Sequence, residues 1–138
     1  MQLHTYLNFD GNCRDAFEFY HEHLGGEILQ MMTWKESPMA ARASPGTEDK
    51  IMHACLGIDG HLLMGSDSMP QCPYQGIKDA GVVITVDEPG KAEQLFEALS
   101  DNAEIRMPMG ETFWAQRFGM LVDRFGVPWM INCAKEGW

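Results

Sequence analysis

The sequence has few basic residues and no long apolar run. Its 138 residues include ten lysines and arginines against twenty aspartates and glutamates, which gives a formal net charge of −10. A polyanion would be repelled by this surplus of negative charge, so we expect no nucleic-acid partner. No apolar stretch approaches the roughly 20 residues that a membrane-spanning helix needs, so we also expect no membrane partner.

Cysteine is scarce as well, and its spacing excludes the usual paired motifs. The four cysteines are Cys13, Cys55, Cys72 and Cys133, and none of them forms a C-x-x-C pair. This spacing excludes a zinc knuckle and a thioredoxin-like redox motif. The first four residues carry neither the basic nor the apolar region of an export signal. We therefore expect a cytoplasmic protein with reduced thiols.

Several catalytic motifs are missing too. The sequence contains no Gly-x-Ser-x-Gly elbow, no P-loop and no His-Glu-x-x-His pair. No glycine-rich loop follows a predicted strand, which argues against an S-adenosylmethionine site and hence against methyl transfer. Since these motifs are absent, they identify no catalytic residue in this sequence.

The first part of the chain predicts a strand and then an amphipathic helix. Apolar residues alternate over 3–9, which is the period of a strand. A helical spacing of apolar residues follows over 13–24, with Asn12 as the expected N-cap. The pair Gly25-Gly26 is the expected end of this helix.

Three further strands are predicted in the first half. One covers 27–34, and two more, over 51–58 and 61–66, flank Asp59-Gly60, a strong signal for a tight hairpin. The segment 35–50 between them contains two prolines and shows no periodicity. A loop of this length is either a mobile flap over a binding cavity or a surface insertion.

The second half repeats this order of elements after a linker over 68–80. Strands are predicted at 82–86, 104–109, 118–122 and 127–133, with a helix that begins near Pro89. The fold class is therefore α+β, with two tandem βαβββ modules that form a concave mixed sheet with the helices on its outer face. We expect a single domain over 1–138, with one module at about 1–67 and the other at about 81–134.

Segments throughout the chain match one known family. They are YLNFDGNC at 6–13, AFEFY at 16–20, LMGSD at 63–67, ETFWA at 111–115 and FGVPWMIN at 125–132. With the duplicated unit, they resemble the vicinal oxygen chelate superfamily of glyoxalase I, bleomycin-resistance proteins and dioxygenases, and most closely its PhnB-like branch. The resemblance covers nearly the whole chain.

This resemblance implies a place for a metal, on the first and last strand of each module. His4 matches the first-strand histidine of glyoxalase I, whereas the other positions offer Met64, Gly81 or Val82, and Met130. A thioether is a soft ligand and suits the hard metals of this family poorly. We therefore predict no cofactor at the usual ligand set. A divalent metal held by a rearranged set, such as His4, His53 and Glu111, is the alternative.

Strand parity predicts which side chains share the face of the sheet that lines the cavity. If His4 faces the cavity, Tyr6 does so too, and the Asp59-Gly60 turn aligns Cys55 with Met64 on that face. The aromatic and acidic segment before the last hairpin is expected at the rim of the pocket. The predicted ligand-binding residues are His4, Tyr6, His53, Met64, Glu111, Trp114 and Met130.

The function predicted from this sequence is binding of a small molecule by a protein that lacks the superfamily's metal quartet. The alternative is a metal-dependent lyase, isomerase or dioxygenase with a rearranged ligand set. We also expect a homodimer, because each sheet is covered by a helix on one face only and the other face carries methionines.

Overall fold

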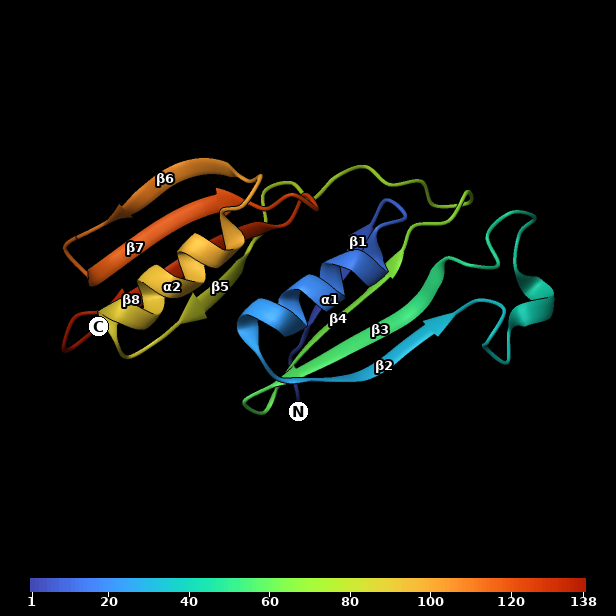
Figure 1. Cartoon of the computed structure of the whole chain (residues 1–138), viewed down its shortest axis with the longest axis horizontal. Helices are drawn as coiled ribbons and strands as arrows, with labels where there is room; N and C mark the ends of the chain where they lie inside the picture. Colours follow the sequence, from blue (N-terminus) through green and yellow to red (C-terminus); the bar gives the residue numbers. More distant parts are fainter. The chain divides into compact units, whose positions relative to one another are not determined.

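Eight strands and two α-helices are arranged as two copies of the same unit in the computed structural model, which describes all residues from 1 to 138. The first unit is Met1–Gly76 and the second is Ile77–Trp138. Each has the chain order βαβββ and one four-stranded mixed sheet (Figure 1). The predicted α+β class with two βαβββ modules is confirmed. Neither α-helix has the length and apolar character needed to cross a bilayer.

In the first unit the sheet order is β1-β4-β3-β2. β1 runs parallel to β4, and the other neighbouring strands are antiparallel. The elements are β1 (Thr5–Phe9), α1 (Cys13–Leu24), β2 (Glu27–Thr33), a 3₁₀ turn (Ala40–Arg42), β3 (Ile51–Ile58) and β4 (His61–Asp67).

The second unit has the equivalent sheet order, β5-β8-β7-β6. Its elements are β5 (Val82–Thr85), α2 (Pro89–Leu99), β6 (Glu104–Gly110), β7 (Ala115–Val122) and β8 (Pro128–Ala134).

The prediction that β7 begins at residue 118 is wrong by three residues. Ala115 already pairs with Ala134, and an irregularity between Ala115 and Arg117 interrupts the alternation that sequence reasoning relies on.

Each core lies between the sheet and its helix. In the first unit Phe9, Phe17 and Leu56 are fully buried, and Phe17 packs edge-to-face on Phe9 with ring centroids 6.0 Å apart. The close approach of α1 depends on Gly65, because a Cβ added there would lie 2.9 Å from the Phe17 ring. In the second unit Trp129 and other apolar residues of β7 and β8 are buried in the same way.

A buried carboxylate caps α1, and it does not come from the predicted residue. Asn12 forms no side-chain cap hydrogen bond, and its buried Oδ1 has no partner. Instead, the backbone N–H of Cys13 donates to Asp67 Oδ1 at 2.9 Å, and the N–H of Ile51 donates to Asp67 Oδ2 at 2.8 Å. Asp67 therefore joins the end of β4 to the start of α1 and the start of β3.

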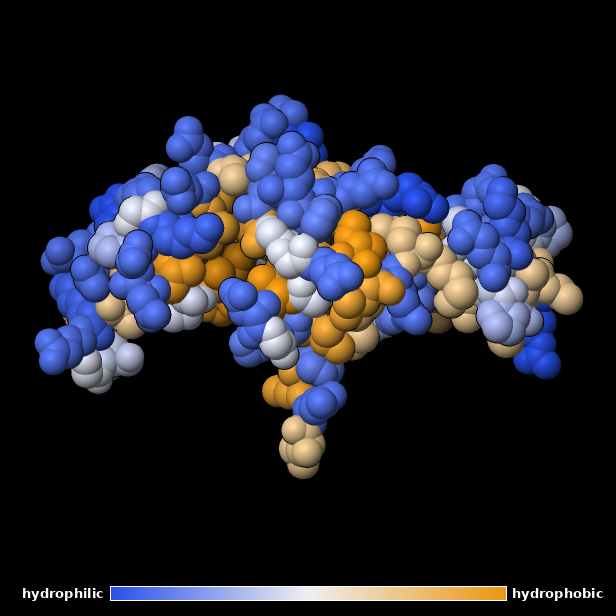
Figure 2. Space-filling view, turned by 60° about the horizontal axis from the view of Figure 1, so that its bottom comes forward, coloured by the Kyte–Doolittle hydropathy of each residue, from blue (hydrophilic) through white to orange (hydrophobic).

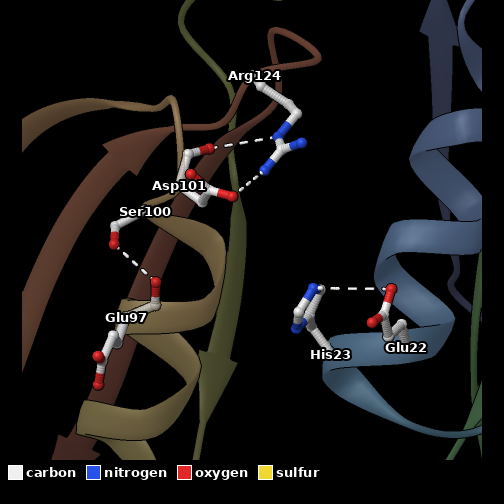
Figure 3. A network of polar contacts seen from close by, with 6 residues as sticks. All are labelled: Glu22, His23, Glu97, Ser100, Asp101 and Arg124. Atoms are coloured by element: carbon white, nitrogen blue, oxygen red, sulfur yellow. Dashed lines mark hydrogen bonds and ion pairs between the residues drawn. The ribbon is translucent and has the colours of Figure 1, made fainter.

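A second buried carboxylate holds the last hairpin. Asp123 Oδ1 accepts hydrogen bonds from the N–H groups of Phe125 and Val127, and its Oδ2 accepts one from Trp129 Nε1 at 2.8 Å. Next to Asp123, the Arg124 guanidinium bonds the carboxylate and the carbonyl of Asp101, just beyond α2 (Figure 3). These contacts tie the β7–β8 turn to the C-terminal end of α2.

The segment between β2 and β3 extends the hairpin before it leaves the sheet. Trp34 N–H donates to the Lys50 carbonyl at 3.1 Å, and Lys35 N–H donates to the Glu48 carbonyl at 3.0 Å. Lys35 and Asp49 also form an ion pair at 2.7 Å, which raises the pKa of the lysine and lowers the pKa of the aspartate. The segment expected as a loop over 35–50 is thus hydrogen-bonded at its base.

Candidate functional site

The candidate site lies on the open face of the first unit's sheet, by which we mean the face opposite α1. Leu7 and Phe9 are buried on the helix side, so alternation places Tyr6 and Asn8 on the open face. Tyr6 is in register with Met64, and Met64 is in register with Cys55. The predicted alignment of Cys55 with Met64 is confirmed, and these three side chains form one row across β1, β4 and β3.

His53 lies next to this row and contacts Tyr6. The two rings stack with centroids 5.8 Å apart and an interplanar angle of 19°. The Tyr6 hydroxyl lies 3.4 Å from His53 Nδ1, within hydrogen-bonding distance. Tyr6 is 48% exposed and His53 is half-buried, so the pair is accessible from solvent. A phenol and an imidazole held together in this way can both donate and accept hydrogen bonds.

A second polar pair lies further along the same strands. Asn8 is in register with Ser66, and the Ser66 hydroxyl lies 3.5 Å from Asn8 Oδ1. The open face of the first unit therefore combines two polar pairs with the sulfur-bearing side chains of Met64 and Cys55. Such a mixture of apolar surface with a few fixed polar groups is typical of small-molecule sites.

The open face of the second unit repeats this arrangement with different chemistry. Val83 is in register with Met130, and Met130 with Met120, at the places of Tyr6, Met64 and Cys55. The position of His53 is taken by an apolar ring, that of Phe118, which is in register with Asn132.

The polar pair of the second unit joins β5 to β8. Asn132 Nδ2 lies 3.4 Å from Thr85 Oγ1, at the place where Asn8 and Ser66 meet in the first unit. The Asn132 Oδ1 is buried and accepts no hydrogen bond. An unpaired buried acceptor of this kind is uncommon in folded proteins.

The structure brings some of the predicted site residues together and not others. Tyr6, His53 and Met64 share the open face of the first unit. His4 precedes β1, and its Nε2 lies 3.3 Å from Gln2 Oε1. The remaining predicted residues, Glu111, Trp114 and Met130, belong to the second unit.

Glu111 and Trp114 have partners within the second unit. Glu111 Oε1 lies 3.2 Å from the Lys135 ammonium, so it forms an ion pair at the surface. The Trp114 ring packs edge-to-face on Phe113 at 4.8 Å and on Phe118 at 5.2 Å. The Trp114 ring therefore lies beside the Phe118 ring.

Sequence reasoning missed two features of these faces. It placed Gly81 or Val82 at the metal position of β5, but Val82 is in register with the buried Trp129, and Val83 is the residue beside Met130. It also did not single out the Asn132–Thr85 pair. Strand parity fixed by the buried Trp129 was the signal that could have identified both.

Burial controls the ionisation of the thiols in the first unit. Cys55 lies in the sheet, and burial raises the pKa of its thiol. Cys13 is completely buried, and burial together with the nearby Asp67 carboxylate raises the pKa of its thiol well above the ordinary range. Both residues are therefore protonated at neutral pH, the form that is least reactive as a nucleophile.

The four open-face positions on the first and last strands fit a hard divalent metal poorly. They carry Tyr6, Met64, Val83 and Met130, which offer one phenol, two thioethers and an aliphatic group, and His4, the predicted first-strand ligand, lies just before β1 and adds a single imidazole. No group of three or more His, Cys, Asp or Glu side chains lies close enough together in the structure to hold a metal ion. Hard divalent cations prefer carboxylate and carbonyl oxygen donors, so a set with two thioethers and an aliphatic group does not suit them.

Comparisons with known proteins agree with this architecture. The family model of the Glyoxalase/Bleomycin resistance protein/Dioxygenase superfamily matches residues 2–131. Protein YjdN of Escherichia coli (strain K12) is 37% identical, over 99% of this chain and 97% of its own. The crystal structure of protein PA1353 from Pseudomonas aeruginosa is 46% identical, has a TM-score of 0.91 and covers 99% of both chains. A PhnB protein from Bacillus cereus, described as a putative 3-demethylubiquinone-9 3-methyltransferase, is 25% identical with a TM-score of 0.80, over 97% of this chain and all of its own.

Proposed function

Because the chain belongs to the Glyoxalase/Bleomycin resistance protein/Dioxygenase superfamily, we propose that it binds a small organic molecule on the open face of the first unit. The stacked pair of Tyr6 and His53 is the observation that carries this proposal. The two rings are already held in contact on an accessible sheet face. Binding of a ligand therefore costs little further side-chain entropy. The sequence offers no glycine-rich loop for S-adenosylmethionine, so the proposal does not include methyl transfer.

The ligand class follows from the groups on this face. Tyr6, His53, Asn8 and Ser66 supply hydrogen-bonding groups, while Met64 supplies a flexible apolar surface. The strands of this sheet carry no lysine or arginine that could pair with a phosphate or another strong anion. We therefore propose a neutral ligand with hydroxyl, carbonyl or amide groups on an apolar frame.

A fragment screen by ligand-observed NMR tests this function. Neutral polar heterocycles should bind to the unmodified protein, and His53→Ala and Tyr6→Ala should each weaken that binding at least tenfold. His61→Ala serves as the matched control, because His61 is an exposed histidine at the first position of β4. Fragments that bind equally well to all variants would contradict the proposed site.

Elemental analysis of untagged protein tests the metal-dependent alternative. We expect no stoichiometric divalent metal, because the donor set on the first and last strands does not suit one. A stoichiometric metal that is lost in His4→Ala or His53→Ala would overturn the proposal in favour of a metal-dependent lyase, isomerase or dioxygenase.

We also propose that the protein is a homodimer in the cytoplasm. Leu29, Val83 and Ile105 are between 42% and 53% exposed, and apolar residues reach the surface between polar ones (Figure 2). A second copy would remove such surface from water. All four cysteines are free thiols, which suits a reducing compartment. Light scattering should give about twice the chain mass of 15.5 kDa, and a monomer at micromolar concentration would contradict the dimer.

A further inference from the structure

Three methionines lie side by side on the open face of the second unit, by which we mean the sheet face opposite α2. Met107 of β6 pairs with Met120 of β7, with an irregularity of the register on either side of Met107, and Met120 is in register with Met130 of β8. These strands are neighbours in the sheet (Figure 1). Directly opposite residues of antiparallel strands point to the same face, with Cβ atoms about 5 Å apart. The three thioethers therefore form one continuous row, which we call the methionine row.

The row is on the open face and accessible from solvent. Gly119, the residue next to Met120, faces α2, because a Cβ added there would lie 2.8 Å from the Phe96 ring. Alternation then places Met120 on the opposite face. Met107 is 43% exposed, and Met120 and Met130 are half-buried. Exposed methionines cost hydrophobic free energy, so three in register on an accessible face need a reason other than core packing.

The donor chemistry of the row identifies the ligand class. Thioethers are neutral, soft donors that favour Cu(I) over calcium, magnesium or manganese. Methionine has three rotatable side-chain bonds, so three sulfur atoms from adjacent strands can converge on one ion without moving the backbone. The net charge of −10 also favours the approach of a cation.

We propose that the methionine row binds a soft monovalent cation, Cu(I), through the sulfur atoms of Met107, Met120 and Met130. The site is independent of the ligand site proposed on the first unit, since it uses none of the same residues. It also gives a physical reason why a thioether, Met130, occupies a strand position where a hard-metal ligand is expected from the fold family.

Methionine-methyl NMR with Ag(I), a redox-inert probe for Cu(I), tests the site directly. The experiment uses full-length protein with ¹³C-labelled methionine methyl groups and the Cys72→Ser substitution, which removes the one exposed thiol. Added Ag(I) should shift the methyl signals of Met107, Met120 and Met130 together and saturably. The signal of Met39, an exposed methionine in the β2–β3 segment, should stay in place.

A competition assay against a Cu(I)-selective chelator measures the contribution of each sulfur. Met120→Leu removes the central donor with little change in volume and should weaken Cu(I) binding at least tenfold, whereas Met39→Leu should leave it unchanged. Circular dichroism establishes that each variant is folded. If Ag(I) shifts only Met64, beside Cys55, or no methionine at all, or if Met120→Leu binds Cu(I) as tightly as the parent, the proposal is wrong. Each of these results leaves the fragment-binding test of the first unit unaffected.

Discussion

The carboxylate of Asp67 accepts the backbone N–H of Cys13 across 54 residues of sequence, at 2.9 Å. The second oxygen of the same carboxylate accepts the N–H of Ile51. One side chain thereby satisfies two buried donors, at the start of α1 and the start of β3. β3 carries His53, and α1 packs on the opposite face of the same sheet, so Asp67 stabilises the sheet on which Tyr6 and His53 meet.

We predict that Asp67→Ala lowers the free energy of unfolding by about 3 kcal/mol, because two buried N–H groups lose a charged acceptor. Urea denaturation followed by circular dichroism measures this change. Asp10→Ala is the control, since Asp10 is exposed, and it should change the free energy of unfolding by less than about 0.5 kcal/mol. Equal effects of the two substitutions would contradict the capping role of Asp67.

Local signals in the sequence predicted most elements well. The helix over 13–24 is observed at Cys13–Leu24, because its apolar spacing is regular and Gly25 adopts the positive φ that ends it. The hairpin at Asp59-Gly60 is also observed, and both residues have positive φ, which a tight two-residue turn requires. Such features depend on neighbours in sequence and are therefore readable from it.

The features that sequence reasoning missed depend on distant residues. Asp67 replaces Asn12 as the cap of α1 from 54 residues away, and no local pattern indicates that contact. The start of β7 at Ala115 depends on pairing with β8 across an irregular register. For the candidate site, parity placed Tyr6, His53 and Met64 on one face, but it could not show that the Tyr6 and His53 rings stack.

We predict opposite effects for two glycine-to-alanine substitutions. A Cβ at Gly65 would lie 2.8 Å from the Leu7 carbonyl oxygen and 2.9 Å from the Phe17 ring, so Gly65→Ala should destabilise the protein by about 1–3 kcal/mol. A Cβ at Gly90, in the first turn of α2, meets nothing within 4 Å, so Gly90→Ala should stabilise by up to about 1 kcal/mol. Thermal unfolding monitored by circular dichroism measures both. A neutral Gly65→Ala would contradict the close packing of α1 on β4.

The Cys13 thiol predicts a dependence of stability on alkaline pH. Its pKa in the folded protein is raised above the ordinary thiol value of 9.0, chiefly by burial and also by Asp67. The unfolded chain therefore releases this proton first, and folding stability falls as the pH rises above about 9, by at most about 1.4 kcal/mol per pH unit. Below that pH the contribution is fully present.

Urea titrations at a series of pH values above and below 9 test this dependence. Cys13→Ala should show a shallower loss of stability between about pH 9 and 10 than the unmodified protein, whereas Cys72→Ala, at an exposed position, should show the same slope. Burial also raises the pKa of Cys55, so part of the slope should persist in Cys13→Ala. An unchanged slope in that variant would contradict the prediction.

We predict that the segment between β2 and β3 is anchored and is not a mobile flap. Amide hydrogen exchange tests this prediction. Thr47 is buried, its hydroxyl donates to the Ser44 carbonyl at 2.6 Å, and its own carbonyl accepts the N–H of Lys50 at 3.0 Å. Thr47→Val keeps the shape of the side chain and removes the hydroxyl. We expect this variant to speed exchange at residues 47 and 50 several-fold while the amides of β3 and β4 exchange as before.

Ser44→Ala is the control, because it removes only the exposed contact with Gln71 and keeps the carbonyl that Thr47 uses. Fast exchange throughout 35–50 in the unmodified protein, slowed when a fragment binds near His53, would contradict the anchored segment and favour the flap.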